Sequence, residues 1–450
     1  MKNKTTDLTV GPVTPLILGM AIPMVWGIVS MIAISLGDIY FIGQLGAKEL
    51  AAISFIFPIT MIFGRLSRGM GTGAGSVIAR SLGAGDQQSV ERLCRDSLIL
   101  SIIVMVVFAA IGLASIDIVF SLMGASPEVL TLIHQYIEIW YLGAVFLAIP
   151  MAGNAIFRAA GNTRTPSRIM VFTSIINLAI APVLIFGLFG FPALGLMGAA
   201  VATITARGLS VIYTLYILIY RESLLTPSIP TPYEFLQSTR SILHVGLPAA
   251  ITAMIIPLSA AILIGIIANY GSDAVAAFGI VTRIEALAMV PLMALAGSIA
   301  PFVGQNFGAQ KYQRIGQGLK SVSILTVGCG LILATILYLF ATPIISIFND
   351  DIAVVRVATD FLIIVPISFI GAGLVMVTSA SCNALGKPRA AIILAVARFM
   401  VFLVPLAFLL GHYFGYVGIF WATFLANFIA AVVAVIILRG LPSVNTKRQI

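Results

Sequence analysis

The chain has 450 residues, of which 60% are hydrophobic and only 9% are charged. Soluble proteins carry roughly a quarter charged residues. With a mean hydropathy of +1.11, the composition excludes a soluble globular protein and indicates a polytopic membrane protein. The three cysteines, Cys94, Cys329 and Cys382, are scattered without a CxxC spacing, which argues against a disulfide framework and a zinc site.

Twelve apolar stretches follow one another along the chain. A helix that crosses a hydrocarbon core of about 30 Å needs ~20 residues at ~1.5 Å each. The predicted spans are 14–43, 51–82, 93–115, 129–159, 166–189, 193–220, 240–269, 275–305, 318–341, 353–383, 389–412 and 415–439. The sequence therefore predicts an all-α membrane protein with twelve transmembrane helices.

Basic residues gather in alternate loops between these spans. Arg92, Arg95, Arg164 and Arg168 are examples, whereas the opposite loops are mostly acidic. This asymmetry is the positive-inside signal and places both termini in the cytoplasm. The formal net charge of +9 therefore reports topology in a lipid bilayer, and we expect no nucleic-acid partner.

The second half of the chain repeats the first. With a shift of 225 residues, Pro23 falls on Pro248 and Gly46 on Gly271. Six spans per copy is an even number, so both copies enter the membrane in the same direction, as in transporters built from parallel repeats. The sequence predicts two pseudo-symmetric six-helix bundles: an amino-terminal lobe (1–220), a cytoplasmic linker (221–239) and a carboxy-terminal lobe (240–450).

The first span contains a lone acid, Asp38, fifteen residues after Pro23. A charge at bilayer depth costs at least about 2.5 kcal/mol, and the short aspartate side chain cannot reach the interface, so we predict a functional site. Pro23 removes a backbone hydrogen bond and is a candidate helix hinge. In the internal repeat Leu263 is the residue that corresponds to Asp38. The second half therefore lacks this acid, and coupling by it is asymmetric.

Polar side chains on nearby spans are candidate partners of Asp38. Ser35 lies three residues earlier, Asn154 is on the fourth span and Asn177 on the fifth. They can exchange hydrogen bonds with a carboxyl group, or they can simply join helices.

Other ionisable residues in the spans have two interpretations each. His134 and Glu138 form either a proton relay or a hydrated interfacial pair. Arg283 and Glu285 are two residues apart and do not share a helix face, so each is expected to find a partner on another helix, either structurally or in the cleft between lobes. Arg207 is assigned a structural role, because long arginine stems can reach the interface or find a partner.

Asp38 suits a proton better than Na+ as coupling ion. Desolvation favours the protonated form of a buried carboxyl group. Na+ would need several oxygen ligands, and no second acid lies nearby in the sequence. Both ions remain open at this stage, and we predict no cofactor and no bound metal.

The chain resembles the multidrug and toxic compound extrusion (MATE) transporters from about Leu16 to Leu438. The resemblance rests on the six-plus-six repeat, on Pro23 followed by Asp38, and on four motifs. These are GMGTGAGSVIARSLGAGD (Gly69–Asp86), GNTRTP (Gly161–Pro166), NLAIAPVLIFG (Asn177–Gly187) and VGQNFGAQK (Val303–Lys311). A single first-helix acid without a second-lobe acidic cluster resembles the DinF-type branch.

This resemblance implies a multi-pass transporter of a prokaryotic plasma membrane, not an enzyme, and we expect a monomer. It implies export of organic cations and other amphiphilic, drug-like compounds by alternating access, in exchange for H+ or Na+. Asp38 is then the protonation site, with Asn154 and Asn177 in its hydrogen-bond network and Thr203 as a further member. It also implies that the first helix bends near Pro23.

One departure from the family pattern bears on the ion. DinF-type members usually carry an acid four residues after the fifth-helix asparagine, and here that position is Ala181. We therefore favour protons. The alternatives are a Na+-coupled drug antiporter and a lipid-linked saccharide flippase, whose basic cleft could include Arg65, Arg68 and Arg283.

Overall fold

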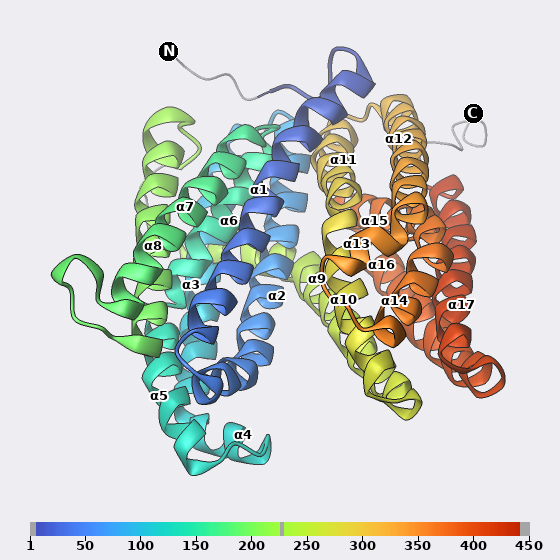
Figure 1. Ribbon diagram of the computed structural model, residues 1–450. Coiled ribbons are helices and arrows are strands. Elements are labelled where there is room, and N and C mark those ends of the chain that lie inside the picture. Colours follow the sequence, from blue (N-terminus) through green and yellow to red (C-terminus); the bar gives the residue numbers. More distant parts are fainter. Residues whose placement is uncertain (1–5, 226–228, 442–450) are drawn as a thin grey trace. The chain divides into compact units, whose positions relative to one another are not determined.

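The structure, a computed structural model, describes residues 6–225 and 229–441 and is helical over most of that range (Figure 1). Part of the predicted linker and the outermost residues of both termini lie outside the described residues. The described residues contain no β-strand, so the all-α prediction is confirmed. They pack as two compact units.

The first unit is formed mainly by residues 26–82 and 86–250. Its helices are α2 (Ala47–Gly83), α3 (Gln87–Ala114), α4 (Ile116–Leu122), α5 (Pro127–Leu142), α6 (Val145–Ala159), α7 (Arg164–Phe186) and α8 (Gly195–Tyr216), with a short 3-10 turn at Leu188–Gly190 and a π-helical continuation of α8 at Ile217–Arg221. The short helix α4 lies beyond α5 at one end of this unit (Figure 1).

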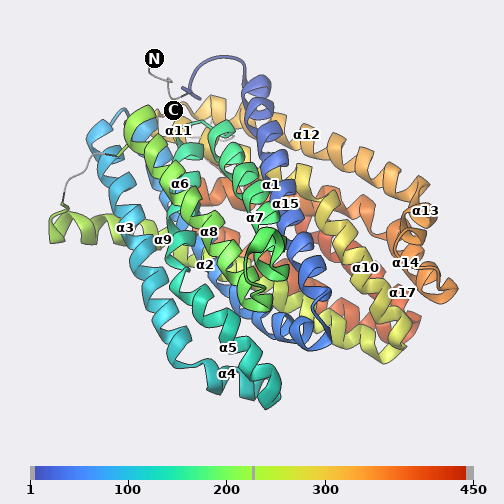
Figure 2. The ribbon, with the colours of Figure 1, turned by 60° about the vertical axis from the view of Figure 1, so that its left-hand side comes forward.

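The second unit is formed by residues 8–25 and by the described chain from Ile251 onward, with a short piece at 83–85. Its helices are α10 (Ser272–Ala288), α11 (Val290–Gly308), α12 (Tyr312–Leu339), α13 (Ala341–Ser346), α14 (Ile352–Ile364), α15 (Phe369–Ala384), α16 (Pro388–Val396) and α17 (Val404–Arg439), with 3-10 turns at Ala268–Tyr270 and Pro366–Ser368 and a π-helical segment at Ala397–Leu403. Figure 2 shows α13 and α14 at the end of α12.

Two long helices are divided between the units at equivalent places. Helix α1 (Val13–Gly43) belongs to the second unit up to Val25 and to the first unit beyond it, whereas α9 (Pro232–Ile267) belongs to the first unit up to Ala250. The two division points match in the internal repeat. The boundary between the compact units thus lies inside α9, beyond the predicted linker. Helix α1 continues through Pro23, and the hinge role of this proline stays a prediction.

The number of crossings agrees with the sequence. Among the described residues, ten helices are long and apolar enough to span a membrane, and α5 with α6, bent by 49° at a short break, makes eleven when the pair is counted as one span. One of the ten, Pro388–Arg439, has 52 residues, far more than the ~20 that one crossing needs. Inside it Gly415 has φ 64° and ψ −151°, a conformation open only to glycine. Two crossings that meet at Gly415 complete the twelve.

An aromatic cluster anchors α5 in the first unit. The ring of Phe63 on α2 lies 5.2 Å from the ring of Trp140 and 5.5 Å from that of Tyr141, measured between centroids. Contacts between aromatic rings of this kind add about 0.5–1.5 kcal/mol per pair beyond the buried area. The cluster therefore holds Trp140 in one orientation beside α8.

Three side chains of the second unit, Gln305, Asn306 and Arg314, bind the segment that precedes α1 by hydrogen bonds, and we call this set the clasp. The side chain of Asn306, on α11, donates to the carbonyl oxygen of Leu8 at 3.0 Å, and Gln305 Oε1 accepts from the Leu8 N–H at 3.0 Å. Arg314, on α12, donates to the carbonyl oxygen of Gly11 at 2.9 Å. The VGQNFGAQK motif thus serves to bind the segment that precedes α1.

Replacing Asn306 with alanine should free this segment. Asn306 is fully buried, and its loss leaves Arg314 Nε without this acceptor and the Leu8 carbonyl with only the bond from Arg314 Nη2, at a cost of about 1–3 kcal/mol. We expect amide hydrogen exchange at residues 8–11 to become at least about tenfold faster. Gln317→Ala, an exposed position on α12, is the control. Unchanged exchange in Asn306→Ala would show that the clasp does not depend on this amide.

Candidate functional site

A cavity of about 240 Å³ opens among the helices of the first unit. It is lined by side chains of α1, α2, α5, α6, α7 and α8. Most are apolar, and the polar ones are Ser35, Asp38, Thr60, Tyr136, Asn154, Thr173, Asn177, Thr203, Arg207 and Ser210, beside the indole of Trp140. The structure thus gathers Ser35, Asp38, Asn154, Asn177 and Thr203, which were selected from sequence, around one space.

Close packing of α1 on α7 places Asp38. A Cβ atom built on Gly37 would lie 2.2 Å from Leu178 Cδ2, so the glycine leaves room for the Leu178 side chain of α7 in its present position. Eight residues before Asp38, the carbonyl oxygen of Ser30 accepts a hydrogen bond of 2.9 Å from Ser174 Oγ. These two contacts fix the part of α1 that carries the acid.

Asp38 is half-buried and is the cavity's one carboxylate. Its Oδ1 atom is buried and has no hydrogen-bond partner in the described part of the chain. This oxygen can therefore accept a hydrogen bond from a ligand's cationic group or take up a proton. The site is therefore suited to binding and releasing a cation or a proton.

The amides beside the acid are also incompletely satisfied. Asn177 Nδ2 donates to Thr203 Oγ1 at 3.3 Å, which joins α7 to α8. The Oδ1 atoms of Asn177 and Asn154 are buried and find no partner in the described chain. They leave acceptor positions in the cavity for a donor group, such as a protonated carboxyl or a ligand amine.

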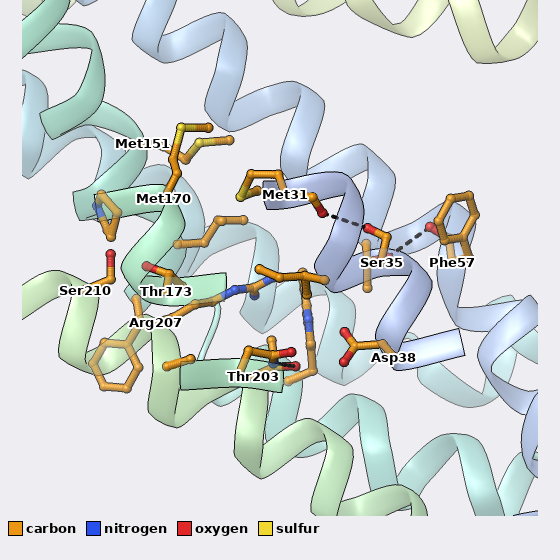
Figure 3. A pocket seen from close by; sticks show the side chains of 18 of the residues that line it. Met31, Ser35, Asp38, Phe57, Met151, Met170, Thr173, Thr203, Arg207 and Ser210 are labelled. Carbon is orange, nitrogen blue, oxygen red and sulfur yellow. Dashed lines mark hydrogen bonds between the residues drawn. The ribbon is translucent and has the colours of Figure 1, made fainter. Parts of the chain in front are cut away.

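Arg207 on α8, for which the sequence predicts a structural role, also lines the cavity. Figure 3 shows its side chain extending into the cavity toward the side where Asp38 lies. The guanidinium carbon lies 5.4 Å from the centroid of the Trp140 ring, a cation–π contact. Its buried Nη1 atom has no hydrogen-bond partner among the described residues. One signal in the sequence could have identified it: Arg207 follows Thr203 by four residues and shares its helix face.

The remaining candidates, Arg283 and Glu285, do not line this cavity. Arg283 is exposed and Glu285 half-buried on α10, in the second unit. Another arginine of the second unit, Arg398 in the π-helical segment Ala397–Leu403, donates from Nε to Asn427 Oδ1 at 2.8 Å and so joins that segment to α17. Roles for Arg283 and Glu285 stay predictions.

The predicted histidine pair also lies away from the cavity. His134 Nδ1 is 2.7 Å from Glu138 Oε1, and His134 Nε2 is 2.9 Å from Asp117 Oδ1. The histidine therefore joins α4 to α5 at one end of the first unit. In the described part of the chain, no group of three His, Cys, Asp or Glu side chains is placed to hold a metal ion.

Comparison with protein families finds the same repeat. The MatE family model matches the chain twice, at residues 23–183 and at 248–409. Each match lies within one predicted half. The internal duplication inferred from the sequence is therefore supported by an independent finding.

Individual relatives match over nearly the full chain. An FAD transporter of Shewanella oneidensis is 33% identical, over 94% of this chain and 93% of its own. A probable multidrug resistance protein, YoeA of Bacillus subtilis, is 28% identical over 89% of this chain and 85% of its own. Among solved structures, the MATE transporter VcmN of Vibrio cholerae in the bent form superposes with a TM-score of 0.90, at 29% identity and 99% coverage of both chains.

Proposed function

Since the chain belongs to the MATE family of membrane transporters, we propose that it exports amphiphilic compounds in exchange for protons by alternating access. Family members are transporters and not enzymes, and its relatives include multidrug exporters. The chain is accordingly a multi-pass protein of the plasma membrane. Its assignment to the DinF-type branch stays a prediction.

The observation that carries the proposal is the lone carboxylate of the cavity, Asp38, with its unpartnered Oδ1. In its charged form Asp38 attracts the cationic group of a substrate. Protonation removes that charge, so proton and substrate compete for one group. Competition of this kind is a negative coupling between two ligands, which is what exchange transport requires. Ser35, Asn154, Asn177 and Thr203 would supply hydrogen bonds to the alternating occupants.

The ion is proposed to be H+ rather than Na+. A bare metal cation needs several oxygen ligands, and the residues that line the cavity include a single carboxylate. Ala181 occupies the place where a second acid is expected, and it is fully buried. A proton needs only one oxygen atom.

The distribution of basic loops further supports cytoplasmic termini, and we propose that one chain suffices for transport.

Proteoliposomes test the coupling ion directly. With the purified protein and a fluorescent organic cation, a pH gradient in sodium-free buffer should drive substrate movement against its gradient. A sodium gradient at equal pH should drive none. Strict dependence on sodium would replace the proton in this proposal, and an absence of transport under both gradients would refute the antiport.

FAD export is a second candidate function. The Shewanella oneidensis relative is named for this activity, and the cavity offers aromatic side chains beside the guanidinium of Arg207. Both features suit an aromatic compound that carries phosphate. The same proteoliposomes, loaded with FAD, provide the test: movement of FAD but of no organic cation would favour this candidate.

A further inference from the structure

The cavity of the first unit holds two opposite charges on different helices. Asp38 lies on α1 and Arg207 on α8, and both line the same space. They form no ion pair with each other among the described residues, whose ion pairs are elsewhere. Each keeps one buried atom without a partner, Oδ1 of Asp38 and Nη1 of Arg207. We propose that this cavity binds zwitterionic aromatic compounds, with a cationic group at Asp38 and a carboxylate or phosphate at Arg207.

The unpartnered atoms favour a ligand that carries both charges. A buried charged group without a hydrogen bond pays a desolvation penalty that a partner would offset. A purely cationic ligand serves Asp38 but is repelled by Arg207. A purely anionic ligand pairs with Arg207 but is repelled by Asp38. A zwitterion satisfies both groups in one binding event.

The surroundings of Arg207 suit an aromatic ligand with an acidic substituent. Arg207 lines the cavity, and the Trp140 ring, 5.4 Å from its guanidinium carbon, limits how the planar fork of N–H donors can turn. A carboxylate or phosphate can accept two parallel hydrogen bonds from such a fork. Met31, Met151 and Met170 line the same space (Figure 3), and methionine adapts to ring systems of different shape.

The position of Asp38 makes the zwitterion the class that combines tight binding with exchange for protons. This step rests on the proposed function. For an anion held at Arg207, protonation of Asp38 removes a nearby repulsion, so proton and anion bind together, which is the wrong sign for exchange. For a zwitterion, protonation removes the contact to its cationic group and weakens binding. The anionic group at Arg207 then adds affinity that does not depend on the proton.

Binding of three dyes with one xanthene framework tests this inference. The compounds are a rhodamine with a free carboxylate (zwitterion), its methyl ester (cation) and fluorescein (anion). The full chain in lipid nanodiscs is titrated at about pH 8, where the dye carboxylates are charged, and fluorescence anisotropy reports the dissociation constant without any ion gradient. The intact protein should bind the zwitterion more tightly than the ester and the anion.

Arg207→Gln should reverse this preference. Loss of a charge-assisted bond should weaken binding of the zwitterion by about tenfold or more, while binding of the ester should stay equal or tighten. Arg207→Lys, which keeps the charge, should retain most of the preference. Arg168→Gln, at an exposed position on α7 that does not line the cavity, is the matched control and should leave all three constants unchanged.

Three results would overturn the inference. They are tighter binding of the ester than of the zwitterion by the intact protein, equal weakening of both dyes in Arg207→Gln, and no weakening of the zwitterion in that variant. If Arg207→Gln does not fold, the dye preference of the intact protein and of Arg207→Lys still decides. Failure of proton-driven transport in proteoliposomes would refute the proposed coupling instead, because the binding assay contains no gradient.

Discussion

Asp38→Asn should abolish proton-driven export while leaving a folded protein in the membrane. Asparagine keeps the size of the side chain but neither carries a charge nor binds a proton in this pH range. Competition between proton and substrate then disappears, and with it the coupling. In cells that lack their own efflux pumps, the intact protein should lower the accumulation of a fluorescent cation, and the variant should lose at least about 90% of that effect, a tenfold loss of rate.

The stability of the same variant separates coupling from structure. The Oδ1 atom of Asp38 has no hydrogen-bond partner in the described chain, so removing the charge also removes a desolvation cost that the attraction of Arg207 offsets only in part. We therefore expect the melting temperature of Asp38→Asn to be equal to or above that of the intact protein. Asp273→Asn, at an exposed position, is the control with the same chemical change. Full export by Asp38→Asn at equal expression would contradict the coupling assignment.

Most of this site can be predicted from the sequence, because burying a charge in a membrane has a high free-energy cost. The cost of Asp38 in an apolar helix is visible without a structure. Asn154, Asn177 and Thr203 were identified from polarity or from the family pattern, and one compact unit brings them together. Their hydrogen-bond partners were not predictable, because rotation of each helix about its axis decides which side chains meet.

Arg207 shows where sequence reasoning stops. A long arginine side chain in a span can reach the interface, pair with another helix or enter a cavity, and these outcomes leave the same trace in the sequence. The contact with the Trp140 ring, 5.4 Å from the guanidinium carbon, keeps the Arg207 side chain in the cavity. That contact joins α5 to α8, which are separated by some sixty residues in the chain, so no local pattern reports it.

Backbone breaks are equally hard to predict. The bend between α5 and α6 falls at Gly143 and Ala144, two small residues inside an apolar run that was predicted as one span. A Cβ atom on Gly143 would lie 2.3 Å from Ile204 Cγ1. The close approach of α8 explains the glycine there, and it depends on tertiary packing.

Gly73→Ala should destabilise the first unit even though alanine is the better helix former. Gly73 lies on α2 within the glycine-rich motif, and a Cβ atom there would meet the carbonyl oxygen of Ile242 on α9 at 2.3 Å and the backbone nitrogen of Gly246 at 2.8 Å. Both clashing atoms belong to the backbone and cannot rotate away. Small residues allow membrane helices to approach in this way, and overpacking of this kind costs about 1–3 kcal/mol.

Gly64→Ala, on the same helix, is the matched control because a Cβ atom there has nothing within 4 Å. Replacing glycine by alanine in an open helical position stabilises the helix by about 0.5–1 kcal/mol. The melting temperature should therefore fall in Gly73→Ala and rise or stay unchanged in Gly64→Ala. A melting temperature of Gly73→Ala at or above that of the intact protein would mean that α2 and α9 do not pack this closely. A fall in Gly73→Ala alone would assign the glycine of this family motif to helix packing, leaving recognition of substrate and proton to the polar side chains of the cavity.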